Sequence, residues 1–148
     1  MPIMAANAQS DARGAAWLLA STVQRCIDDP DTAPGSQDAL NNVYRLLEAF
    51  RKNIFFGSRP LGAQHSAPRD FEMLTMAPSS ERHMWEIRDA IESALSSTFQ
   101  SASTDDAVER VETVLRAVAA PQRYQVSDEE KSNAKLFFSQ LLNTLSKG

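Results

Sequence analysis

The sequence lacks most of the features that identify an enzyme from its amino acids alone. It has no Walker loop, no Gly-x-Gly-x-x-Gly fingerprint and no Gly-x-Ser-x-Gly elbow, so the common nucleotide-binding and hydrolase chemistries find no support. Its two histidines are not part of any repeated pattern of metal-binding residues. We therefore expect a protein with no catalytic activity, no cofactor and no bound metal.

Disulfides, long apolar runs and a surplus of basic residues are also missing. The single cysteine, Cys26, cannot form an internal disulfide, which fits a reducing compartment. The apolar run at residues 15–20 is far too short to cross a bilayer, and residues 1–10 do not have the layout of a signal peptide. The formal net charge of −4 does not suit a protein that binds phosphate backbones. We expect a cytoplasmic protein that binds neither membranes nor nucleic acid.

What the sequence does contain is a regular helical pattern. Apolar residues recur three and four positions apart in five stretches, glycine is scarce, and no stretch alternates as a strand would. This pattern predicts an all-α, single-domain bundle of about five helices over residues 10–148, after a flexible lead at residues 1–9. The predicted helices begin near Asp11, Ser36, Ser80, Ser103 and Ser127. Asp106 and Glu130 lie three residues after the last two serines, as in a capping box.

Residues 57–80 form the one long irregular segment. Several prolines and glycines interrupt it, and about two dozen residues is long for a connection inside a compact domain. We expect a short helix near residues 69–75, and loops of this length often carry function. A ligand pocket beside this loop would take its polar groups from four side chains, which are Arg59, His65, Arg69 and Asp70.

His83 and Cys26 are the remaining candidates for chemistry. Glu86 follows His83 by three residues, and such a pair can contribute to a metal site in a helical bundle. No second pair occurs, so we interpret His83 as an ordinary residue near a helix start. Cys26 falls within an apolar stripe, which predicts a small buried hydrophobic residue.

Three acidic residues, Asp105, Glu109 and Glu112, form the clearest charged feature. They fall on one narrow stripe of the predicted fourth helix, roughly 120° from its apolar stripe, so we expect them to face water. Such a ridge can bind a basic partner. The simpler interpretation is a solvated helix face, in part neutralised by Arg116, which follows Glu112 by four residues.

The two tryptophans lie away from the apolar stripes of their helices. Trp85 is about 130° from the centre of its stripe, and Trp17 about 140° from its own. Either each ring is buried beneath a second neighbour, which we favour, or it is exposed and contacts a partner, as tryptophan often does. Arg88 and Asp89 would then complete a mixed aromatic and charged patch around Trp85.

These features favour a non-catalytic, cytoplasmic protein-binding module. One concrete form is an acidic inhibitor, of the immunity-protein type, that neutralises a basic toxin, because negative charge speeds association with a positive surface. The predicted partner-binding residues are Asp105, Glu109, Glu112, Trp85, Arg88 and Asp89. Two alternatives remain open. One is a small-ligand-binding or enzymatic domain with a pocket beside residues 57–80. The other is a structural domain that forms a homodimer through Leu136 and Trp85.

Overall fold

The computed structural model describes residues 12–29, 36–51 and 81–146. These residues form five helices and no strand, which confirms the prediction of an all-α bundle. The helices are α2 (Ala12–Asp28), α3 (Ser36–Arg51), α5 (Glu81–Thr98), α6 (Thr104–Ala119) and α7 (Asp128–Ser146). The predicted lead at residues 1–9 and the predicted loop at 57–80, with its short helix, lie outside the described residues.

Serine caps set the starts of α6 and α7 as the sequence predicts. The Ser103 hydroxyl accepts a hydrogen bond from the backbone N–H of Asp106 at 3.2 Å, and the Ser127 hydroxyl accepts one from the N–H of Glu130 at 3.1 Å. Each cap satisfies an N–H group that has no partner within its helix, and such a cap stabilises a helix by about 1 kcal/mol. At the other end, α6 stops two residues before Pro121.

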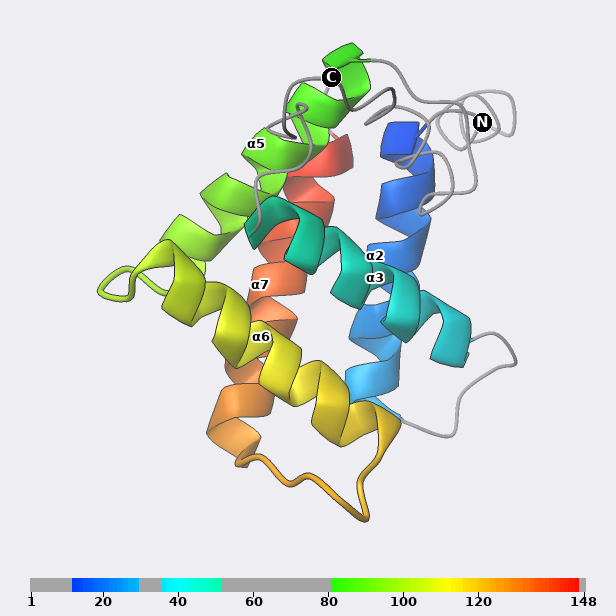
Figure 1. Ribbon diagram of the computed structural model, residues 1–148, viewed down its shortest axis with the longest axis vertical. Coiled ribbons are helices and arrows are strands. Elements are labelled where there is room, and N and C mark those ends of the chain that lie inside the picture. Colours follow the sequence, from blue (N-terminus) through cyan, green and yellow to red (C-terminus); the bar gives the residue numbers. More distant parts are fainter. Residues whose placement is uncertain (1–11, 30–35, 52–80, 147–148) are drawn as a thin grey trace, which may run out of the picture.

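The core is built around α7. This helix packs against α2, α5 and α6, while α3 reaches the core through α2 and α6. Figure 1 shows α3 and α6 crossing in front of α7, with α2 and α5 to either side. The rings of Phe137 and Phe138 are fully buried and meet edge to face, with their centroids 5.0 Å apart. Cys26 is buried in the same core, as its place in the apolar stripe predicts.

Helices α3 and α6 lie side by side and run in opposite directions (Figure 1). At one end, Arg51 in the last turn of α3 contacts Asp105 in the first turn of α6. Toward the other end, the guanidinium of Arg116 donates a hydrogen bond to the hydroxyl of Tyr44 at 2.7 Å. One flank of α6 therefore faces a neighbouring helix through polar side chains, and we call this contact the α3–α6 seam.

Candidate functional site

The predicted acidic ridge on α6 is exposed at its first two positions and buried at the third. The side chains of Asp105 and Glu109 are 74% and 56% exposed, whereas that of Glu112 is 0% exposed. The prediction that Glu112 faces water is therefore wrong. The physical reason is α3, which covers the flank of α6 that carries Glu112, although this flank lies well away from the apolar stripe.

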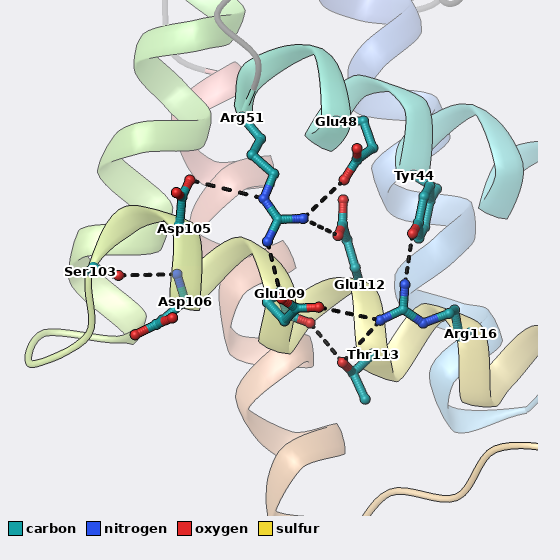
Figure 2. A network of polar contacts seen from close by, with 10 residues as sticks. All are labelled: Tyr44, Glu48, Arg51, Ser103, Asp105, Asp106, Glu109, Glu112, Thr113 and Arg116. Atoms are coloured by element: carbon teal, nitrogen blue, oxygen red, sulfur yellow. Dashed lines mark hydrogen bonds and ion pairs between the residues drawn. The ribbon is translucent and has the colours of Figure 1, made fainter.

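Arg51 joins the two helices at one end of the seam. Its Nη1 donates to Oε1 of Glu112 and to Oε2 of Glu48, both at 3.2 Å. Its Nη2 donates to Oε1 of Glu109 at 3.1 Å, and its Nε lies 3.9 Å from Oδ1 of Asp105 (Figure 2). A single guanidinium thus contacts four carboxyl groups from two helices, so α3 supplies much of the charge that neutralises the ridge.

Arg116 neutralises the ridge in a different way from the one predicted. Its guanidinium does not form an ion pair with Glu112; it binds the Tyr44 hydroxyl and lies 3.6 Å from Oε2 of Glu109. It also donates to the hydroxyl of Thr113 at 3.4 Å (Figure 2). Its positive charge still acts on the Glu112 carboxyl and lowers the pKa of that group.

The balance of effects on Glu112 favours the neutral form. Burial raises the pKa of Glu112 to about 8, the hydrogen bond and negative charge of Glu48 raise it as well, and Arg51 and Arg116 oppose the shift. Glu112 therefore holds its proton in most molecules at neutral pH. The buried Oε2 of Glu112 receives no hydrogen bond from a donor group of the described residues. A hydrogen bond between this oxygen and Glu48 thus requires a proton on one of the two carboxyl groups.

Trp85 on α5 is more exposed than predicted. The residue is 45% exposed, so the expectation that it is buried is wrong, whereas Trp17 is partly buried against the core. The mixed patch around Trp85 is present: Nη1 of Arg88 lies 3.5 Å from Oδ1 of Asp89 and 3.2 Å from Oε1 of Glu92. An aromatic side chain and a set of charged ones therefore lie within about two turns of α5.

The end of α3 connects the Trp85 patch with the acidic ridge. The guanidinium of Arg88 lies over the ring of Phe50, 5.6 Å from its centroid, and the next residue of α3 is Arg51, which binds the ridge. One member of the Trp85 patch and the acidic ridge thus contact consecutive residues at the end of α3. We call the surface formed by Trp85, Arg88, Arg51, Asp105 and Glu109 the α5–α3–α6 face.

Sequence reasoning missed Glu48 and Arg51 as members of this site. Arg51 lies in the last turn of a helix, where its charge has a sufficient explanation in the helix dipole. A usable signal was the surplus of carboxylates on α6, because a row of like charges along one helix face favours a cation on the neighbouring helix.

The remaining candidates for chemistry contribute little to this face. His83 lies half-buried in the first turn of α5, and Glu86 forms ion pairs with Arg13 at 3.7 Å and with Arg82 at 3.4 Å. Within residues 12–29, 36–51 and 81–146, no three His, Cys, Asp or Glu side chains are placed to hold a metal ion. The four residues of the predicted pocket, Arg59, His65, Arg69 and Asp70, lie outside the described residues.

A cavity of about 20 Å³ lies between α2, α3, α5 and α7. Its walls are apolar side chains that include Ala20, Val43, Ile91 and Phe137. A space of this size holds about one water molecule, and its walls offer no polar group to orient a ligand. No helix in the described part of the chain is both long enough and apolar enough to cross a membrane.

No family model matches this chain, and no curated protein or solved structure is similar to it at a significant level.

Proposed function

We propose that the protein is a non-catalytic protein-binding module and that its partner binds the α5–α3–α6 face. The observation that supports this most strongly is the exposure of Trp85, 45% of which is open to solvent in a helix whose other large apolar residues are buried. Tryptophan is prominent among residues that dominate binding energy, because it buries a large area with little loss of side-chain freedom.

The exposed acidic residues of α6 favour a partner with basic groups. Asp105 and Glu109 remain largely exposed although each contacts Arg51, and the whole chain carries a formal net charge of −4. A lysine or arginine of the partner would bind the solvent-facing sides of these carboxylates. Since Arg51 and Arg116 already neutralise part of the ridge, we expect Trp85 to contribute more to affinity than the acidic residues do.

An inhibitor of a basic toxin is one specific form of this proposal. A face that carries both exposed acidic residues and an exposed aromatic side chain suits the positive surface that a nucleic-acid-cutting toxin needs. A cytoplasmic location belongs to the same proposal and draws on the lone cysteine, which is buried in the core.

Affinity capture with matched variants tests the proposal. Immobilised wild-type protein and its Trp85→Ala and Leu136→Ala variants are exposed to the same native lysate, and each captured protein is quantified. Leu136 is the control, because it is a large apolar residue with similar exposure on a different helix, α7. We expect one basic protein to be lost at least about 10-fold on Trp85→Ala, a loss of roughly 1.4 kcal/mol in binding, and kept on Leu136→Ala.

Two results would contradict the proposal. One is equal retention of every captured protein by the wild type and Trp85→Ala. The other is a wild-type dimer that Trp85→Ala converts to a monomer in light scattering, because the face would then serve self-association instead. Asp105→Asn adds a smaller test: it removes an exposed charge and should weaken capture mainly at low salt.

A further inference from the structure

The α3–α6 seam contains more carboxyl groups than its cations can neutralise. Four carboxyl groups, those of Glu48, Asp105, Glu109 and Glu112, surround one guanidinium, that of Arg51. Asp105 and Glu109 are exposed, so water stabilises their charges. Glu112 has no contact with solvent, and the same nitrogen of Arg51 serves both Glu112 and Glu48 at 3.2 Å.

A negative charge on the buried Glu112, added to the one on Glu48, would destabilise the folded protein. A buried carboxylate needs donors for its oxygens, and Oε2 of Glu112 has none within the described residues. Figure 2 shows the Glu48 and Glu112 carboxyl groups lying together on one side of the Arg51 guanidinium. Two carboxyl groups that share a site cannot readily ionise together, and one proton between them turns repulsion into a hydrogen bond.

We propose that Glu48 and Glu112 share one proton and that this proton lets α3 pack on α6. The proton on Glu112 Oε2 donates to the Glu48 carboxylate, while Arg51 binds the remaining oxygens of both groups. Loss of the proton leaves two anions in contact inside the seam, and α3 separates from α6. The seam thus acts as a pH-sensitive contact beneath the α5–α3–α6 face. This inference concerns the seam itself and does not depend on the proposed partner.

The charged groups that act on the pair come from both helices of the seam. Glu48 and Arg51 belong to α3, and Arg116 belongs to α6. The other strong ion pair of α6 joins Arg110 to Glu130 of α7, and it involves neither carboxyl group of the pair. From α2, the titratable side chain buried in the same core is Cys26.

The direction of the pH effect follows from linkage. The folded protein holds the Glu112 proton up to about pH 8, whereas the unfolded chain releases it near the ordinary value for glutamate. The protonated Glu112 carboxyl stabilises the folded protein fully at a pH below the ordinary pKa of glutamate. This stabilisation is lost as the pH rises to about 8. Alkaline conditions therefore weaken the seam.

Thermal unfolding between about pH 5 and pH 9 tests the inference. Glu112→Gln keeps the shape of the protonated group and donates from its amide, so it cannot lose the interaction at high pH. We expect the Tm of the wild type, relative to that of Glu112→Gln, to fall by about 5 °C across this range. Taking the difference cancels the contribution of every titratable group that the two proteins share.

Two further variants separate proton sharing from simple burial. Glu48→Gln removes the second carboxylate, so the fall in Tm with rising pH should shrink, because Glu112 no longer ionises beside a negative charge. Glu109→Gln, which removes an exposed carboxylate that also binds Arg51, should leave the fall unchanged. A flat difference between the wild type and Glu112→Gln would overturn the inference. So would a fall that Glu48→Gln leaves intact, and this comparison remains decisive if Glu112→Gln does not fold.

Discussion

Arg51 links more charged groups than any other side chain in the described residues. Its guanidinium connects Glu48 on its own helix with Asp105, Glu109 and Glu112 on α6. Burial alone would lower the pKa of Arg51, but its hydrogen bonds to Glu109 and Glu48 raise it, so the group stays positively charged at every practical pH. The charge on Arg51 is constant, and any pH sensitivity of the seam comes from the carboxyl groups around it.

Replacing Arg51 with methionine should destabilise the protein by about 1–3 kcal/mol, because the buried Oε1 of Glu112 loses a donor. The loss should be larger at pH 8 than at pH 5, since Arg51 opposes the rise in the pKa of Glu112 and matters most when that group ionises. Urea denaturation at the two pH values measures both quantities. An equal loss at both would show that Arg51 acts only through packing.

At the scale of helices, Arg110 joins α6 to the start of α7 and to the end of α5. Its guanidinium makes two hydrogen bonds to the Glu130 carboxylate of α7, at 3.1 and 2.6 Å, and lies 4.7 Å from the ring centroid of Phe99, directly after α5. Glu130 was predicted to bond back to the start of its own helix. Its carboxylate instead binds Arg110 and Asn133. The contact with Arg110 therefore fixes how α6 meets α7.

Replacing Glu130 with glutamine should cost about 0.5–1 kcal/mol at neutral pH, a modest amount because Arg110 is partly exposed. The hydrogen bond from Arg110 lowers the pKa of Glu130. The stability that ionised Glu130 adds is therefore fully present at a pH above the ordinary pKa of glutamate, and it is lost as the pH falls through the lowered pKa of Glu130. The variant and the wild type should thus converge in stability as the solution is made strongly acidic. Glu129→Gln, an exposed neighbour, is the control and should change stability by a few tenths of a kcal/mol.

The helices themselves could be predicted because their causes are local. Apolar spacing, the serine caps at Ser103 and Ser127, and Pro121 act within a few residues, and the structure follows them. The surroundings of Glu112 and Trp85 could not be predicted in this way. A helical pattern gives the direction of a side chain from its own axis, but whether a second helix lies there depends on how the whole bundle packs.

At the scale of the whole molecule, one helix decides what the surface can do. By packing along α6, α3 buries Glu112, partly neutralises the acidic ridge and connects it to the Trp85 patch through Phe50 and Arg51. The face proposed for a partner and the pair proposed to share a proton therefore depend on the same contact. A partner that binds this face should bind more weakly at alkaline pH, where α3 is held less firmly.

Proton sharing in the α3–α6 seam requires a neutral Glu112 carboxyl at neutral pH. Carbon-13 NMR of the side-chain carboxyl groups, followed from acid to alkaline pH, measures this directly when Glu112→Gln is used to assign the signal. We expect a midpoint near pH 8 for Glu112, several units above the ordinary value for glutamate. A Glu112 signal that titrates near the ordinary value for glutamate would contradict the proposed shared proton.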